Sequence, residues 1–254
     1  IVKYTSEEEL AIKNKYCDYS TAAGTVVDSR DGKSYRYKRY GNMEWFVDNL
    51  NYTDEEMDGG NPNSIAHPED AEGDIYGRMY RTFSTNANIG ANWCPEGWNM
   101  PVASNWNSLL TEIQTAYELS EDQVVSAMLG GGDRDNDADG LWAKGTLGST
   151  ASDEQRAQVG FNLLPAGVWA YGTNYDKYEL ALDTKGRKAA FVTGGKNAYF
   201  HTEFAINSLT KTAPSRNSRH YGSVRCFRTR TDKVITFLEF TQMVYGDSDC
   251  EPEA

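Results

Sequence analysis

Apolar and polar residues alternate along an early part of the chain. Residues 25–50 alternate in the manner of strands, and Val26, Tyr35 and Tyr37 are side chains that favour strands. Asp31-Gly32 lies between two such runs, and an Asp-Gly dipeptide is a strong signal for a tight hairpin turn. The pattern therefore predicts an antiparallel β-hairpin near the start of the chain.

Helix-start signals occur at four places. Ser6-Glu7-Glu8-Glu9 combines a capping hydroxyl with acidic side chains, which suit the positive end of the helix dipole. Ser120 and Ser152 begin similar capping boxes. Ser104 precedes the clearest apolar stripe, which has the spacing of a core-facing helix at Trp106, Leu109, Leu110 and Ile113. We predict helices that begin at these serines, with the Ser104 helix ending near Tyr117.

Loops and short strands account for the rest of the pattern. Residues 53–74 are acidic and contain Gly59-Gly60-Asn61-Pro62-Asn63, which predicts a long loop. After Gly160 the chain alternates between short strand-like runs and aromatic loops as far as Arg228. Early strands, then helices, then a strand-rich second half indicate the α+β class.

The charge of the chain narrows the function classes. It has 25 Lys and Arg residues against 37 Asp and Glu residues, a formal net charge of −12. This sign argues against nucleic acid or anionic lipid as a partner, because both need Lys and Arg on the binding face. No run of about 18 apolar residues predicts a membrane span. The chain starts at Ile1 rather than Met, so we expect a processed or truncated product.

Several sequence blocks together point to a family. The most distinctive is Cys94-Pro95-Glu96-Gly97-Trp98-Asn99-Met100-Pro101, in which two prolines and a glycine stiffen the chain around a large apolar anchor. The other blocks, in chain order, are 31–35, 41–52, 76–80, 104–110, 160–167 and 221–226. Through these blocks, residues from about 24 to 228 resemble the Fibrobacter succinogenes major paralogous domain, a secreted bacterial module.

The resemblance implies a C-type-lectin-like α+β fold with long loops, related to the fold of formylglycine-generating enzymes. It divides the chain into an N-terminal helical extension over 1–23, the family domain over 24–228 and a C-terminal strand extension over 229–254. It also implies a location outside the cell or on the bacterial cell surface. The resemblance does not identify a ligand, because one fold serves many functions.

Cysteine usage is consistent with an oxidising compartment. The four cysteines have no Cys-x-x-Cys spacing, so we expect no zinc site, and they allow three pairings. The family resemblance implies a Cys94–Cys226 disulfide, which leaves Cys17 and Cys250 as the second pair. Such bonds are typical of extracellular proteins.

Alternating aspartates form the strongest candidate metal site. The carboxylates are those of Asp133, Asp135, Asp137 and Asp139. From Asp135 the pattern is Asp-x-Asp-x-Asp-Gly, as in the first half of an EF-hand loop, and Ca²⁺ takes six to eight oxygen ligands. The twelfth position is Thr146 rather than Glu, so other groups would have to complete the shell. We predict Ca²⁺ at this segment; a solvated acidic loop is the alternative.

An aromatic and polar stretch is the candidate ligand site. Sugars stack on exposed aromatic rings while amide and carboxyl groups bind their hydroxyls. The candidate residues are Trp169, Tyr171, Asn174, Tyr175 and Tyr178. The alternative is that Trp169 and one tyrosine belong to the core.

We expect no catalytic activity. The chain has three histidines, His67, His201 and His220, and no Gly-x-Ser-x-Gly nucleophile motif. Related sulfatase-modifying enzymes use a reactive cysteine pair, and no second cysteine lies near Cys226. The sequence therefore favours a binding module for an extracellular glycan or protein.

The C-terminal segment supports a second hypothesis. Residues 233–245 have strong β propensity and apolar side chains at both alternating sets of positions. They form either an extra strand of their own domain or a strand that joins a neighbouring copy. A Cys17–Cys250 bond would bring the N-terminal helix to the same place, so the alternative function is a subunit of an extracellular filament that assembles through its termini.

Overall fold

The computed structural model describes residues 4–58, 61–81, 93–132, 140–143, 151–171, 178–180, 185–194, 201–205, 208–212 and 220–230. These residues form four helices, α1 (Ser6–Tyr16), α2 (Ala103–Ala116), α3 (Glu121–Ala127) and α4 (Asp153–Val159). They also form the strands β1 (Gly24–Val27), β2 (Ser34–Tyr40), β3 (Met43–Phe46), β4 (Met57–Asp58), β5 (Asn61–Pro62), β6 (Ser64–Ala66), β7 (Arg78–Arg81), β8 (Trp169–Tyr171), β9 (Tyr178–Leu180), β10 (Ala189–Val192), β11 (His201–Ala205), β12 (Ser208–Thr212), β13 (His220–Gly222) and β14 (Phe227–Thr229). The predicted α+β class is confirmed.

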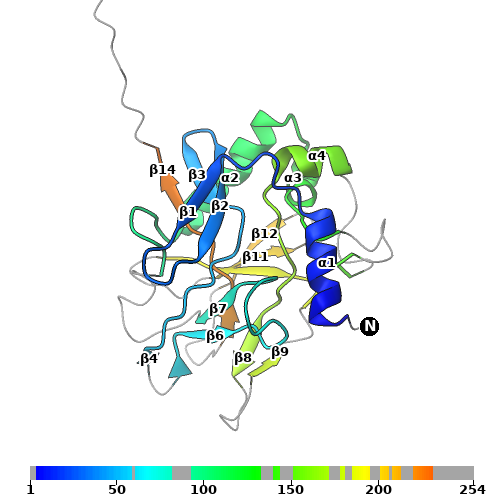
Figure 1. Cartoon of the computed structure of the whole chain (residues 1–254). Coiled ribbons are helices and arrows are strands. Elements are labelled where there is room, and N and C mark those ends of the chain that lie inside the picture. The colour runs from blue at the N-terminus through cyan, green and yellow to red at the C-terminus, as the bar shows by residue number, and fades with distance from the viewer. Residues whose placement is uncertain are drawn as a thin grey trace, which may run out of the picture.

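Two antiparallel sheets carry most of the architecture (Figure 1). One has the strand order β1-β2-β3-β14, and the other has the order β6-β7-β13-β8-β9. Strands β10, β11 and β12 form a third sheet, and β4 pairs with β5. Strands β13 and β14 come late in the chain, yet they pair with β7 and β3 from its first third. The segment between them therefore ties the two main sheets together.

The predicted hairpin is confirmed. Strand β1 pairs with β2 so that Val26 lies opposite Tyr35. The amide of Asp28 donates to the carbonyl of Lys33 at 2.8 Å at the base of the turn. Gly32, within the turn, has a φ of 74°, a left-handed conformation that glycine adopts without steric cost.

Three of the four helix-start predictions are confirmed to within one residue by their capping contacts. The cap of α1 is Thr5 rather than Ser6: the Thr5 hydroxyl accepts from the Glu8 amide, and the Glu8 carboxylate accepts from the Thr5 amide at 2.7 Å. Ser120 and Ser152 precede α3 and α4 as predicted.

The predicted cap of α2 is wrong, although the helix and its end are confirmed. The helix begins at Ala103, so Ser104 lies inside it, and its C-terminal cap is Tyr117. Asn105 Oδ1 accepts from the amide of Val102 at 2.8 Å. This contact supplies an acceptor for one of the unpaired amides at the helix start.

The prediction of a continuous loop over 53–74 is wrong. The segment contains β4, β5 and β6, and β6 pairs with β7 with Ile65 opposite Met79. Ile65 is buried, at 4% exposure. Strands of two or three residues are too short to show a periodic pattern, and their partners are determined by tertiary pairing.

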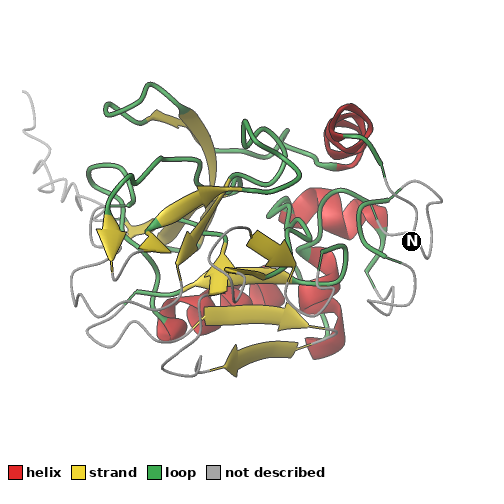
Figure 2. Cartoon of the chain, turned by 90° about the horizontal axis from the view of Figure 1, so that it is seen from below, coloured by secondary structure: helices red, strands yellow, loops and turns green. Residues whose placement is uncertain are grey.

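Aromatic side chains fill the core between the four-stranded sheet and α2. The predicted stripe is buried at Trp106, Leu109 and Ile113. The ring centre of Trp106 lies 4.8 Å from that of Trp45 on β3 and 4.9 Å from that of Phe191 on β10. Helices α2, α3 and α4 gather on one side of the sheets (Figure 2), while α1 runs along a flank of the domain (Figure 1).

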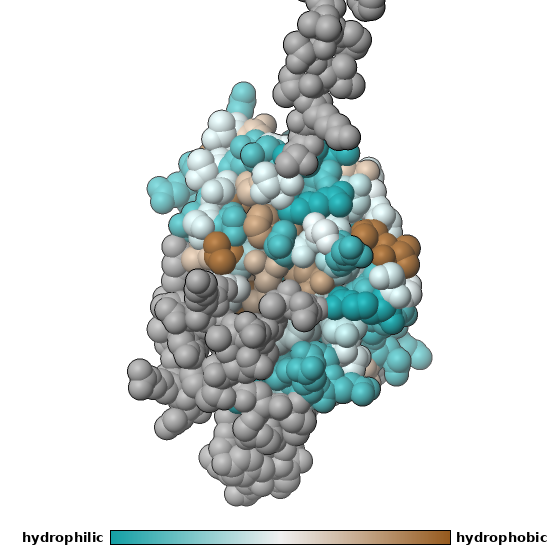
Figure 3. Space-filling model, turned by 90° about the vertical axis from the view of Figure 1, so that its left-hand side faces the viewer, coloured by the Kyte–Doolittle hydropathy of each residue, from teal (hydrophilic) through white to brown (hydrophobic). Residues whose placement is uncertain are grey.

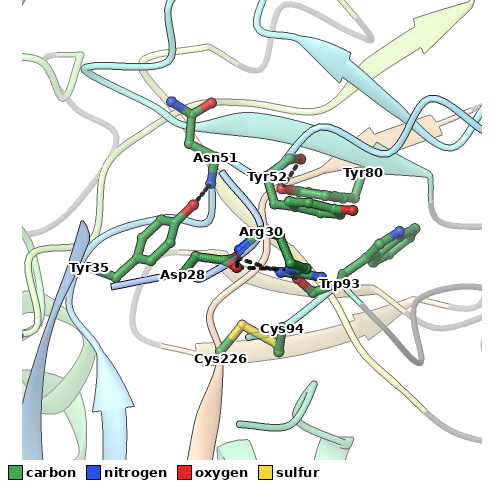
Figure 4. The surroundings of a disulfide bond; sticks show 9 residues. All are labelled: Asp28, Arg30, Tyr35, Asn51, Tyr52, Tyr80, Trp93, Cys94 and Cys226. Carbon is green, nitrogen blue, oxygen red and sulfur yellow. Dashed lines mark hydrogen bonds and ion pairs between the residues drawn. A yellow bond between two sulfur atoms is a disulfide. The ribbon is translucent and has the colours of Figure 1, made fainter. Parts of the chain in front are cut away.

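The Cys94–Cys226 disulfide that the resemblance implies is present in the structure. It joins the segment after Trp93 to the residue before β14, and both cysteines are buried. Arg30 lies close by in Figure 4, where its guanidinium stacks on the Tyr52 ring at 3.6 Å and donates to the Trp93 carbonyl at 2.6 Å. The β1–β2 turn is thereby fastened to the disulfide region.

Cys17, at the C-terminal cap of α1, is buried and forms no disulfide with any residue that the structure describes. Its expected partner, Cys250, lies outside the described residues, so the Cys17–Cys250 pairing stays a prediction. The same holds for the predicted strand over 233–245.

Replacing both Cys94 and Cys226 with alanine should lower the free energy of unfolding. The bond closes a loop with a sequence separation of 132 residues, and opening it restores entropy to the unfolded chain. We expect a loss of about 2–5 kcal/mol in chemical denaturation. An unchanged denaturation midpoint in the double variant would contradict this role.

Candidate functional site

A polar groove lies between helix α1, the β1–β2 hairpin and the loop that joins β6 to β7. Its volume is about 690 Å³, which is within the range of small-molecule sites. Five separate stretches of the described chain line it, and their residues are Lys13, Thr25, Lys33, Ser34, Tyr35, Arg36, Asp48, Asn49, Asn51, Glu72, Gly73, Asp74, Ile75 and Gly77. The groove therefore depends on tertiary packing rather than on one motif.

A bidentate ion pair stands in the groove. Arg36 on β2 donates from Nε and Nη2 to the two carboxylate oxygens of Asp48, at 2.8 and 2.5 Å, and its backbone amide donates to the same carboxylate at 2.8 Å. The guanidinium also lies 3.2 Å from the ring centre of Tyr19. Burial alone would raise the pKa of Asp48, but its hydrogen bonds and charge interaction with Arg36 outweigh burial and hold that pKa below its ordinary value. Arg36 is thus fixed before any ligand arrives.

Helix α1 contributes a buried lysine to the groove. The Lys13 ammonium donates to the carbonyl oxygen of Asp74 at 2.5 Å, and the residue is 9% exposed. Burial lowers the pKa of Lys13, and the charge of Asp48 opposes that shift only in part. The contact ties α1 to the loop that forms the opposite wall.

That opposite wall requires a glycine. Asn51 Nδ2 donates to the Glu72 carbonyl at 2.8 Å, so the Asn51 side chain lies flat against the 72–77 loop. Gly73 has a φ of 74°, and a Cβ atom at this position would lie 2.3 Å from Asn51 Oδ1. Any larger residue at position 73 would push this wall away from Asn51.

The charged side chains of the lining balance one another. Its cationic residues are Lys13, Lys33 and Arg36, and its anionic residues are Asp48, Glu72 and Asp74. The chain as a whole has a formal net charge of −12. By this count, the lining that the structure describes is neutral within an acidic protein.

A fully buried arginine lies behind the groove. Arg225 donates from Nε to Asn49 Oδ1 at 2.7 Å, and Asn49 is itself a lining residue. Its Nη atoms donate to three backbone carbonyls, those of Phe46 at 3.1 Å, Phe161 at 2.6 Å and Asn162 at 2.8 Å. Burial lowers the pKa of Arg225 to about 10, which still leaves the group charged at neutral pH.

A second buried group supports the 67–77 loop. Asp70 accepts from the amides of Ile75 and Tyr76 at 2.9 and 2.7 Å and so closes the loop on itself. His67 is fully buried: its Nδ1 accepts from the Glu69 amide at 3.2 Å, and its Nε2 lies 3.1 Å from the Ala166 carbonyl. This arrangement fits a neutral ring that carries its proton on Nε2, and burial lowers the pKa of His67 to about 4.

The predicted aromatic ligand site is only partly within the described chain. Trp169 is 4% exposed, and its indole donates to the Ala166 carbonyl at 3.0 Å, so its ring is a core group and is not available to stack on a sugar. We therefore remove Trp169 from the candidate site. Tyr171 and Tyr178 lie opposite each other on β8 and β9. Asn174 and Tyr175 lie outside the described residues.

The predicted calcium ligands Asp133, Asp135, Asp137 and Asp139 lie outside the described residues. Gly132, next to them in the chain, lines a smaller hollow of about 190 Å³ between α1 and α4. Within the described ranges, no group of three or more His, Cys, Asp or Glu side chains is arranged to hold a metal ion.

The groove was not among the sites predicted from the sequence. The available signal was the run Asp48-Asn49-Leu50-Asn51, in which three polar residues follow the fully buried strand β3. Polar side chains directly after a buried strand must find partners or face a cavity. The partners on α1 and in the 72–77 loop leave no comparable mark in the sequence.

The described structure is an α+β domain with a polar groove built against a buried arginine. The model of the Fibrobacter succinogenes major domain matches residues 39–228, and the chain belongs to this family. Neither a curated protein nor a solved structure matches the chain. In the described part, none of the helices combines the length and apolar character needed to cross a membrane.

Substitution of Arg225 should be among the most destabilising changes in the chain. Arg225→Met would leave four acceptors without a donor in the core, and we expect a loss of about 3–5 kcal/mol in the free energy of unfolding. Arg225→Lys should recover only part of it, because an ammonium cannot match the fork of a guanidinium. The control is Arg39→Met, because the Arg39 side chain is 52% exposed. Its expected loss in the free energy of unfolding is below about 1 kcal/mol. Equal losses in R225M and R39M would contradict the role of Arg225.

His67 should make stability depend on pH. Its pKa is about 4 in the folded protein against an ordinary value of 6.5, so the unfolded chain binds the extra proton between these values. Stability should therefore be complete above pH 6.5 and fall as the pH drops toward 4, by up to about 3 kcal/mol from this group. His67→Gln, which keeps an acceptor and a donor, should remove this component. Parallel curves of unfolding free energy against pH for the two proteins would refute the assignment.

Proposed function

We propose that the protein is a non-catalytic binding module and that the groove between α1, the β1–β2 hairpin and the 72–77 loop takes a carbohydrate or another polar extracellular ligand. The observation that carries this proposal is the groove itself, about 690 Å³ of polar, charge-balanced space whose side chains are held in place by contacts on their far sides. Rigid polar sites of this kind recognise ligands by hydrogen bonds made at little cost in ordering.

The neutral lining favours an uncharged ligand with many hydroxyl groups. A hydroxyl both donates and accepts, so it can bind beside an ammonium and beside a carboxylate. The groove offers both kinds of partner close together, since Lys13 contacts the backbone of Asp74 and both residues line it. A strongly anionic or cationic ligand would meet a like charge within the same space. A sugar meets none.

Acceptors for such hydroxyls are present at the mouth of the groove. The Glu72 and Asp74 carboxylates form no ion pair with any residue in the described ranges, and Ser34 contributes an exposed hydroxyl. The aromatic ring in the lining, Tyr35, is buried and stacks on Phe46 at 5.1 Å. Binding would therefore rest on hydrogen bonds rather than on stacking by Tyr35.

Three finer parts of the proposal rest on the sequence. The family resemblance supports a C-type-lectin-like arrangement of the α+β fold. The buried Cys94–Cys226 bond is consistent with a protein that folds in an oxidising compartment and acts outside the cell or at its surface. Ca²⁺ binding at Asp133, Asp135, Asp137 and Asp139 stays a prediction, and so does a filament as the alternative function.

A glycan array followed by calorimetry tests the proposal. Asp74→Ala combined with Ser34→Ala removes one carboxylate and one hydroxyl from the groove while leaving the backbone contact of Lys13 intact. We expect binding of the glycan found on the array to weaken at least about tenfold, or about 1.4 kcal/mol. Glu121→Ala, an exposed acidic site on α3, is the matched control and should bind like the wild type.

Two outcomes would count against the proposal. Glycan binding that survives the double substitution would move the site away from the groove. A wild-type protein that binds none of the glycans would reject carbohydrate as the ligand class.

A further inference from the structure

The outer edge of β1 pairs with no strand among the residues that the structure describes. Backbone groups of alternate residues in an antiparallel strand point to opposite edges. The Asp28 amide donates to the Lys33 carbonyl, so the backbone amides and carbonyls of Asp28 and Val26 face β2. The backbone amides and carbonyls of Thr25 and Val27 therefore point away from β2. Within the described chain, no backbone hydrogen bond reaches this edge. Four residues of β1 thus present two outward pairs of amide and carbonyl groups.

The opposite edge of the same sheet is partly closed. Strand β14 forms that edge, and its outward residues are Phe227 and Thr229 because Arg230 and Cys226 bond to the β3 side. Asn99 already bonds to the outward backbone groups of Phe227: its amide donates to the Phe227 carbonyl at 2.8 Å, and its carbonyl accepts from the Phe227 amide at 2.9 Å. Only Thr229 remains for a further strand at that edge. β1 is therefore the edge of this sheet with room to extend.

The side chains of β1 also indicate that another strand covers this edge. Val27 is 60% exposed and is one of two large hydrophobic residues that are exposed among those described. Among the described residues on the face in Figure 3, teal and white atoms predominate and the dark brown atoms lie in separate spots. An exposed valine on an open strand edge is therefore unusual for this surface, and natural edge strands more often carry charge or proline.

The chain itself contains a segment suited to this edge. Residues 231–254 come after β14, and within them Val234, Ile235, Thr236 and Phe237 are all residues of high strand propensity. Residues 233–245 contain no proline and two charged side chains, Lys233 and Glu239. Such a sequence is hazardous if it stays unpaired.

The strand order argues for pairing between copies. The described chain ends at Arg230, just after β14, and β1 lies at the other edge of the sheet, three interstrand spacings or about 14 Å away. The segment of the same chain would have to cross a face of the sheet to reach β1, and the nearer edge at β14 is already occupied at Phe227. A second copy can bring the segment to β1 directly.

We propose that residues 233–245 of one copy add as a fifth strand to the outer edge of β1 in the next copy. The contact joins two different surfaces, the end of one molecule and the hairpin of another, so it repeats head to tail and grows into a filament unless the rotation closes a ring. Backbone hydrogen bonds to Thr25 and Val27 supply the register, and Val27 gains an apolar neighbour. This proposal does not depend on what the groove binds.

Light scattering of the full-length chain over a range of concentrations is the first measurement. The wild type should grow in mass with concentration. Val27→Pro should stay monomeric, because proline removes the outward amide donor, and an edge strand tolerates proline where that amide makes no bond. Val27→Thr keeps both the donor and the strand propensity, so it should still associate. Circular dichroism and the melting temperature establish that each variant is folded.

Hydrogen exchange and a competing peptide complete the test. The amides of Thr25 and Val27 should exchange more slowly in the associated wild type than in the V27P monomer, and a synthetic peptide of residues 233–245 in excess should dissociate the oligomer. A wild type that stays monomeric at every concentration would overturn the proposal, as would a folded V27P that still associates. Slow exchange at position 25 in a monomer would show that the chain covers its own edge, which also overturns it.

Discussion

The buried guanidinium of Arg225 is the group on which the rest of the structure depends. It is fully buried, and its hydrogen-bond partners are neutral: Asn49 Oδ1 and the carbonyls of Phe46, Phe161 and Asn162. Removing such a charge from water is costly, so the arrangement is stable only when each N–H fork reaches its acceptors. One side chain thereby fixes the end of β3, the segment after α4 and the segment between β13 and β14 relative to one another.

The contacts of Arg225 also hold the walls of the groove in place. Asn49 accepts from Arg225 and donates to the Tyr76 carbonyl at 2.9 Å, so the same amide connects the core to the 72–77 wall. Next to it, Asp48 holds Arg36 on β2. Asp48 and Asn49, which are adjacent after β3, therefore connect the core to opposite walls of the groove. A substitution of Arg225 should therefore shift the side chains that line the groove, although Arg225 does not line it.

Local signals in the sequence predicted the elements better than they predicted the site. The Asp31-Gly32 turn, the serine caps before α3 and α4 and the apolar stripe through Trp106 are short-range patterns, and each corresponds to an observed element. The strands over 57–66 were missed because two or three residues carry no period. The groove was missed for a related reason: Lys13, Arg36 and Asp74 lie far apart in the chain, and only folding brings them together.

The family resemblance supplied what local patterns could not. It implied the Cys94–Cys226 pair, although four cysteines alone left three pairings open. Trp169 shows the opposite limit. An aromatic residue in a polar stretch resembles a sugar platform in the sequence, yet its indole bonds to Ala166 and packs edge-on against His67 in the core. Composition around a residue does not reveal which way its ring points.

The late position of β13 and β14 has a consequence for how the chain is made. β13 is the middle strand of its sheet, β14 is bonded to β3, and Arg225 and Cys226 lie between them. A ribosome adds residues in order, so a nascent chain that ends before residue 220 lacks the centre of one sheet, an edge of the other, the core cation and half of the disulfide. The β1–β2 hairpin can form early, because its contacts are local. The domain can complete its fold only after nearly all of its sequence has been made. Until then, its aromatic core residues are exposed to contact with other molecules.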